Sequence, residues 1–180
     1  ALHERKKLKV DKIDYKKEFK QLYSPPAKEP VIVEVPAMNY LLVDGMGDPA
    51  VSQDYMDSIE ALYSVSYTLK FMIKKAQGID YGVLPLEGLW WADDMKEFTL
   101  NNRDQWKWTS MIMQPEFVTR ELVAQAMQEA AKKKKLPSLA KMRFEVLHEG
   151  KAAQIMHIGP YSAEAPTIEK LHLFMKDKGS

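Results

Sequence analysis

The sequence has no cysteine among its 180 residues. That absence excludes disulfide bonds, thiol nucleophiles and thiolate metal sites, and it is typical of proteins in a reducing compartment. Neither sign of charge is in excess, because 26 basic residues face 25 acidic residues and the net charge is +1. A chain so balanced has no overall field that would attract nucleic acid or an anionic membrane. We therefore expect neither as a partner.

Long apolar runs are also lacking. A helix that crosses a membrane needs about 20 consecutive apolar residues, and no segment of the sequence approaches this length. The first residues, "ALHERKKLKVDK", are charged, whereas a secretory signal peptide would carry an apolar stretch. These features predict a cytoplasmic protein.

The composition that remains is that of a globular protein. Hydrophobic residues make up 46% of the chain, which is enough for one domain with a sizeable core. Residues 1–30 are rich in lysine and end in "SPPAKEP", and they predict an N-terminal arm that wraps the surface. The domain itself is predicted to span residues 31–180.

The first half of the chain has clear periodic patterns. From Val31, "VIVEVPAMNYLLVDGMGDP" predicts one strand that ends in a turn. Ser52 is a candidate N-cap for a helix over 52–76, where apolar residues recur at three- and four-residue steps. Two extended segments follow, 79–91 and 105–113, and they predict an antiparallel pair joined by a long polar loop.

The second half repeats part of this order. A helix is expected over 116–135, with Thr119 as a possible cap and four lysines at the negative end of its dipole. In "KMRFEVLHEGKAAQIMHIGPYS" we expect two strands joined at the turn Glu149–Gly150. A last helix is predicted over about 166–177, with Pro166 near its first position.

These elements predict an α+β fold. The order strand, helix, strand, strand occurs once completely and once without its last two strands, so we expect a duplicated unit with a truncated second copy. The two helices of the repeat should lie on the same face of a mixed sheet. Where the last strands are missing, the sheet edge would be left unpaired, and we expect the chain either to form a homodimer through that edge or to lose stability.

The stretch "YGVLPLEGLWWADD", residues 81–94, is the strongest indication of a site. Alternation along a strand places Glu87 on the same face as Tyr81 and Trp91, although Pro85 can interrupt the register. Aromatic faces bind planar apolar rings and attract cations. A carboxylate among apolar groups would attract a cation, or would be tuned toward a general base. Ordinary core packing is the alternative for every tryptophan here.

Four segments carry a resemblance to a known family: "MNYLLVDGMGDP", "YGVLPLEGLWW", "WKWTSMIMQPEFVT" and "FEVLHEGKAAQIMHIGPYSAEAPTIEKLH". The chain resembles the GyrI-like small-molecule-binding proteins over roughly residues 11–178, and specifically their stand-alone, tryptophan-rich branch. This resemblance implies two units related by a pseudo-twofold axis with a groove between them. Members include effector domains of multidrug-sensing activators, a gyrase-inhibitory protein, and hydrolases that open the cyclopropane ring of DNA-alkylating compounds. The acidic residue that members carry on their last strand has no counterpart in this sequence.

The resemblance and the residues together define the predicted site. Glu87 would activate a water molecule, and Tyr81 or Tyr161 would hydrogen-bond to the oxygen that takes up charge. No metal or other cofactor is expected, since the histidines lack metal-ligand spacing with a carboxylate partner. The residues predicted to bind a small hydrophobic or cationic aromatic ligand are Tyr40, Trp90, Trp91, Trp106, Trp108, Met111 and His157.

Three functions remain open at this point. The first is a module that binds planar or cationic small molecules without converting them, and the second is a cofactor-independent hydrolase that uses Glu87. The third is an inhibitor that binds another protein through an exposed tryptophan patch. The sequence contains no helix-turn-helix segment, so we do not expect a complete transcription factor.

Overall fold

The computed structural model describes residues 12–179, so residues 1–11 of the predicted arm and Ser180 lie outside the described part. The chain divides into two compact units. Within the described residues, the first unit holds 12–13 and 38–146, and the second holds 14–37 and 147–179.

The first unit is built on a four-stranded sheet in the order β5-β6-β3-β7. Its strands are β3 (Met38–Met46), β5 (Glu87–Trp91), β6 (Lys107–Gln114) and β7 (Arg143–Leu147). The β5–β6 and β3–β6 pairs are antiparallel, which confirms the predicted pairing of the two extended segments. Strand β6 is buried almost throughout, because it lies between two neighbouring strands and packs against α3 on one face.

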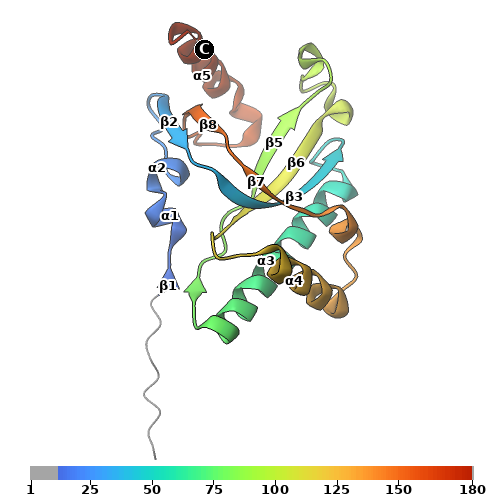
Figure 1. Cartoon of the computed structure of the whole chain (residues 1–180). Helices are drawn as coiled ribbons and strands as arrows, with labels where there is room; N and C mark the ends of the chain where they lie inside the picture. The colour runs from blue at the N-terminus through green and yellow to red at the C-terminus, as the bar shows by residue number, and fades with distance from the viewer. Residues whose placement is uncertain (1–11, 180) are drawn as a thin grey trace, which may run out of the picture. The chain divides into compact units, whose positions relative to one another are not determined.

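Helix α3 (Gln53–Gln77) packs on β3 and β6, and α4 (Arg120–Lys133) lies beside it (Figure 1). The predicted cap of α3 is confirmed, since the Ser52 side chain accepts a hydrogen bond from the Tyr55 backbone N–H at 3.2 Å. Gly78 ends the helix with a φ of 70°, a conformation that glycine adopts without strain. The buried stripe of α3 comprises Ser58, Ala61, Leu62, Val65, Ser66, Leu69 and Ile73.

Helix α4 also begins where the sequence predicted its cap. The Thr119 hydroxyl accepts a hydrogen bond from the Leu122 backbone N–H at 3.3 Å. The buried side chains of α4 are small, namely Val123, Ala126 and Ala130. Small side chains let two helices approach closely, which suits the packing of α4 against α3.

Two details of the predicted strands are wrong. The single strand expected from Val31 is interrupted at 36–37 and forms β2 (Val31–Val35) and β3, since Pro36 has no N–H to donate to a ladder. Strand β8 (Gly150–Gln154) does follow β7, but the two do not form a hairpin. Strand β2 pairs with β8, and β7 pairs with β3.

The second unit contains the antiparallel β2–β8 pair together with helices α1 (Tyr15–Glu18), α2 (Lys20–Tyr23) and α5 (Ala165–Asp177). Pro166 lies in the first turn of α5, as predicted. The backbone N–H of Met156 donates to the Pro26 carbonyl at 3.0 Å, and Lys170 Nζ lies 2.9 Å from Glu29 Oε1. These contacts connect the segment before β2 to the segment after β8.

Short elements complete the two units. In the first unit, β1 (Lys12–Ile13) pairs in parallel with β4 (Asp80–Tyr81). The 3₁₀ turns are η1 (Met95–Glu97), η2 (Arg103–Gln105), η3 (Pro137–Lys141) and η4 (Tyr161–Ala163).

The predicted α+β class is confirmed by these helices and largely antiparallel sheets. The described strands form three sheets rather than one continuous sheet, and the duplication of the unit stays a prediction. Within residues 12–179, none of the helices combines the length and the apolar character that a bilayer crossing requires.

Candidate functional site

The four-stranded sheet has one face that packs against α3. Three contacts define it: Ser58 Oγ donates to Ser110 Oγ at 3.3 Å, Gln114 Nε2 donates to Ser66 Oγ at 3.1 Å, and the Trp108 ring meets Tyr55 edge-on. The even-numbered residues of β6 therefore point toward α3. Since side chains alternate along a strand, the odd-numbered residues of β6 point to the opposite face.

That opposite face carries Glu87. In the register of the sheet, Glu87 lies opposite Met111, and Met111 lies opposite Leu42. Directly paired residues share a face, so these three side chains form one row across β5, β6 and β3. Tyr40 is two residues before Leu42 on β3, and it joins the same face through its pair with Met113.

Leu89 and Trp91 extend this face along β5. They lie opposite Thr109 and Lys107 of β6, two and four residues beyond the Glu87 pair. Glu87 and Trp91 are half-buried and Leu89 is 45% exposed, whereas Tyr40, Leu42 and Met111 are buried. We call this set the Glu87 face; its residues are Tyr40, Leu42, Glu87, Leu89, Trp91 and Met111.

A polar network adjoins the row of Leu89 and Thr109. Asp44 Oδ1 accepts from Thr109 Oγ1 at 2.7 Å, and Arg143 Nη2 donates to both oxygens of Asp44 at 2.8 and 2.9 Å. Arg143 Nη1 also donates to Glu145 Oε2 at 2.8 Å. Burial acts to lower the pKa of Arg143, but the two carboxylates outweigh it and the pKa is raised. Arg143 is therefore a fixed cation between two anions.

Sequence reasoning missed this network. The position of Asp44 could have been predicted, because alternation along "YLLVD" places it on the same face as Tyr40. The sequence carries no signal for Arg143, because its contact with Asp44 depends on the pairing of β7 with β3, two strands that are far apart in the sequence.

Trp90 and Trp108 lie on the other face, toward α3. They are paired across β5 and β6, and the Tyr55 ring lies 5.5 Å from Trp90 and 5.1 Å from Trp108. Trp108 is completely buried. A Cβ at Gly45 would come within 2.1 Å of the Trp108 ring, and a Cβ at Gly88 within 2.6 Å of Trp90 Nε1. Glycine at these two positions makes room for the indole rings.

Trp106 stabilises the loop between β5 and β6. Its Nε1 donates to the Thr99 carbonyl at 3.1 Å, and Phe98 stacks on its ring at 4.5 Å. The Arg103 guanidinium lies over the same ring at 5.3 Å, and the Trp90 ring lies 6.2 Å away. Trp106 thus joins the α3-side cluster through Trp90 and does not share the face of Glu87.

The prediction that Tyr81 and Glu87 share one face of a strand is wrong. Residues 82–86 are not part of a strand, so alternation cannot be carried from Tyr81 to Glu87 across Pro85. Tyr81 is 1% exposed, and its ring meets Phe117 edge-on at 5.5 Å. Burial raises the pKa of its hydroxyl above the ordinary value, so the phenol is neutral at physiological pH.

Tyr161 and His157 belong to the second unit. Tyr161 begins η4 and is 89% exposed. The His157 ring bridges its own loop and helix α5, with Nδ1 2.9 Å from Thr167 Oγ1 and Nε2 3.1 Å from the Pro160 carbonyl. This geometry fixes the turn that precedes Tyr161.

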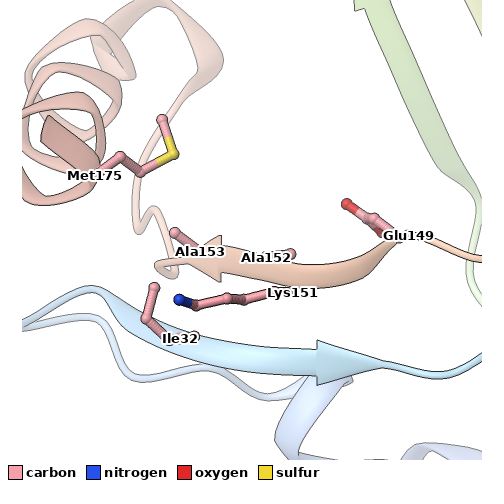
Figure 2. Close-up of a pocket in the computed structure, with 6 residues that line it drawn as sticks. All are labelled: Ile32, Glu149, Lys151, Ala152, Ala153 and Met175. Carbon is pink, nitrogen blue, oxygen red and sulfur yellow. The ribbon is translucent and has the colours of Figure 1, made fainter. Parts of the chain in front are cut away.

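The second unit also contains a hollow of about 320 Å³ between the β2–β8 pair and α5 (Figure 2). Its lining is small and mixed, and includes no aromatic residue and none of the predicted site residues. The lining residues are Ile32, Glu149, Lys151, Ala152, Ala153 and Met175. We therefore base the candidate site on the Glu87 face.

The chemistry available at the Glu87 face is that of a carboxylate beside apolar and aromatic groups. Aromatic rings bind planar molecules, and the carboxylate attracts a cation or accepts a proton. In the described part of the chain, no group of three histidine, aspartate or glutamate side chains is arranged to hold a metal ion.

Comparison with known proteins gives a consistent result. A family model, the GyrI-like small molecule binding domain, matches residues 28–179. The chain is similar to a crystal structure of an uncharacterized conserved protein from Listeria innocua, with 40% identity and a TM-score of 0.85, over 93% of this chain and 82% of that one. A search of curated proteins gives no match.

Two crystal structures of hydrolases from Listeria innocua are also similar. One is 39% identical with a TM-score of 0.80, and covers 93% of this chain and 85% of the hydrolase. The other is 40% identical with a TM-score of 0.84, and covers 94% of this chain and 82% of that chain.

Proposed function

The chain belongs to the GyrI-like small-molecule-binding domain family, and we propose that its Glu87 face binds a planar apolar ligand that carries or develops positive charge. One observation supports this proposal above the others. The strand register lines up Glu87, Met111 and Leu42 in one row, with Trp91 further along β5 on the same face. A planar ligand that spans the four-residue step from Glu87 to Trp91 along β5, roughly 13 Å, can then contact a carboxylate and an aromatic ring at once.

The residues of the Glu87 face would make different contributions to binding. Trp91 and Leu89 offer apolar surface that is partly exposed, and a flat ring can cover it. Glu87 contributes charge complementarity, since a cation near a half-buried carboxylate is less screened than one in water. Tyr40 and Met111 are buried, so they support the shape of the face from below the ligand.

The same carboxylate supports a sharper proposal, hydrolysis of a cyclopropane-bearing electrophile. Glu87 would take a proton from water, whose oxygen forms a bond to the strained carbon. The carbon–carbon bond of the ring breaks, and its electron pair moves into the conjugated system, where an oxygen becomes negative. Glu87 then returns the proton to that oxygen, so the carboxylate is regenerated and one water is added.

Two relatives at about 40% identity are described as hydrolases, and this likeness supports the hydrolytic proposal. Tyr161 belongs to the second unit and is exposed, so it is assigned no step at the Glu87 face, and its role as a hydrogen-bond donor stays a prediction from the sequence. Tyr81 is better explained as a core residue. Binding without conversion is the alternative, and the family description supports it equally.

Turnover by the wild-type protein and by Glu87→Gln distinguishes hydrolysis from binding without conversion. The substitution keeps the shape of the side chain and removes the base, so affinity for a neutral cyclopropane compound should stay within about twofold while turnover falls by about 10²-fold or more. Turnover is measured as the mass gain of one water by chromatography and mass spectrometry. Glu149→Gln, which changes a carboxylate in the second unit, is the matched control and should leave turnover unchanged.

If the wild-type protein binds the compound and never converts it, the hydrolytic proposal is wrong and the binding proposal stands. If Glu87→Gln leaves both binding and turnover unchanged, the Glu87 face is not the site.

A further inference from the structure

Helix α3 carries an aromatic stripe on the side that faces away from the sheet. Tyr63, Tyr67 and Phe71 follow one another at four-residue steps, and adjacent ring centres are 6.4 Å apart. Tyr67 is 47% exposed and Phe71 is 59% exposed. Met56, which is 48% exposed, extends the stripe toward the start of the helix.

This stripe is unusual because α3 already buries its opposite side. The buried residues of the helix, from Ser58 to Ile73, face the sheet and α4. Tyr63 is half-buried and its hydroxyl accepts a hydrogen bond from the Leu86 backbone N–H at 3.3 Å, but Tyr67 and Phe71 are not needed for the packing of the first unit. Contiguous exposed apolar residues of this kind mark interaction surfaces more often than scattered ones do. Aromatic residues also contribute most to the energy of protein interfaces.

The charges that flank the stripe have opposite signs at its two ends. Asp57 and Glu60 lie beside it in the first half of α3, and Lys74 and Lys75 lie beside it in the last half. If two copies of α3 meet in antiparallel fashion with Tyr67 at the centre, the acidic end of one copy faces the basic end of the other. A parallel arrangement would place like charges together and is disfavoured.

From this self-complementarity we infer that the stripe of Met56, Tyr63, Tyr67 and Phe71 is the surface through which two copies of the chain associate, with their α3 helices antiparallel. The same two-fold arrangement places Tyr63 of one copy against Phe71 of the other. The interface is isologous, so it closes at a dimer and forms no fibre.

Contacts within the chain do not prevent this association. Glu60 pairs with Lys134, and Lys74 pairs with Asp80 at 2.7 Å. The side chains of Glu60 and Lys74 are still 41% and 50% exposed, so each can share its charge with a second partner. The surface is one helix wide, and small interfaces of this kind give weak dimers.

Sedimentation velocity tests the inference on the whole chain. The sedimentation coefficient should rise with concentration over about 5 to 500 µM, the range in which small interfaces associate. Phe71→Asp should weaken association by at least about tenfold, because it places a charge against the Tyr63 ring of the other copy. Val51→Asp is the matched control, since Val51 is 74% exposed outside the stripe, and it should not change association.

Charge exchange gives an independent test. Glu60→Lys alone and Lys74→Glu alone should each weaken the dimer by about threefold or more, and the double variant should recover most of the loss. Thermal unfolding of each variant checks that the first unit is intact, because both residues also make contacts within the chain.

The inference fails if the wild-type chain stays monomeric across the concentration range. It also fails if a dimer forms and Phe71→Asp leaves it unchanged, because the dimer then uses another surface, such as the sheet edge expected from the sequence. Failure of this test does not affect the proposed ligand site, whose residues lie on the face of the sheet opposite α3.

Discussion

The two faces of the four-stranded sheet use tryptophan in different ways. Toward α3, Trp90 and Trp108 enclose Tyr55, and glycines at positions 45 and 88 make room for their rings. On the opposite face, Trp91 is half-buried and shares β5 with Glu87. Trp90 and Trp91 are neighbours in the sequence, yet one supports the scaffold and the other belongs to the candidate site.

This difference follows from strand geometry alone. Successive side chains of a strand point to opposite faces, so two adjacent tryptophans cannot serve one surface. A rigid α3-side cluster also fixes the backbone of β5, from which Glu87 and Trp91 project. Sites built on strands hold their side chains more exactly than sites on loops do.

The largest expected effect is a difference in stability between tryptophan variants of the two faces. Trp108→Ala should lower the free energy of unfolding by about 3 to 5 kcal/mol, because it removes a fully buried indole and leaves a cavity. Trp91→Ala should cost less than about 1.5 kcal/mol, since its side chain is only half-buried. Urea unfolding measures both values. Equal losses for the two variants would contradict the division between scaffold and site.

A second effect of intermediate size concerns the room around the Trp108 ring. Gly45→Ala should destabilise the protein by about 1 to 3 kcal/mol, since the new Cβ would lie 2.1 and 2.3 Å from ring carbons of Trp108. Gly82→Ala is the control, because the nearest atom to its Cβ is 3.8 Å away, at the end of the Lys12 side chain. Should both variants unfold at the same urea concentration, the close fit of Gly45 and Trp108 has no energetic importance.

The smallest expected effect is the pH dependence of stability that Asp80, a residue outside the Glu87 face, contributes. Hydrogen bonds from Lys74 and Lys70 lower the pKa of Asp80 from 3.8 to about 2. A pKa that is lowered by folding means that the ionised carboxylate stabilises the folded state above pH 3.8 and that this stabilisation is lost as the pH falls through about 2.

Asp80→Asn should therefore be less stable than the wild type at neutral pH, and the difference should shrink as the pH falls from about 4 toward 2. Thermal unfolding across this range measures it. A difference that stays constant with pH would show that the carboxylate charge of Asp80 is not responsible.

Local features of this fold could be predicted from the sequence. The caps at Ser52 and Thr119 were found because capping depends on residues within one helical turn. The antiparallel pairing of β5 with β6 followed from two extended segments that are close in the sequence. The position of Trp91 on the face of Glu87 needed only alternation within one strand.

Features that depend on distant pairing could not be predicted. The break at 82–86 separates Tyr81 from the strand of Glu87, and Pro85 was the one residue in the sequence that indicated such a break. The network of Asp44 and Arg143 depends on β7 joining β3. Strand alternation separates Trp90 from Trp91, but which of the two faces packs against the scaffold depends on the position of α3, which no local pattern reveals.

The most direct test of the Glu87 face is a fluorescence titration with two planar ligands of the same shape, one cationic and one neutral. For Glu87→Gln, the account predicts that affinity for the cationic ligand falls by about tenfold, which corresponds to about 1.4 kcal/mol, while affinity for the neutral ligand changes by less than about twofold. An equal loss for both ligands, or no loss for either, would show that the Glu87 carboxylate does not recognise charge and would contradict the account.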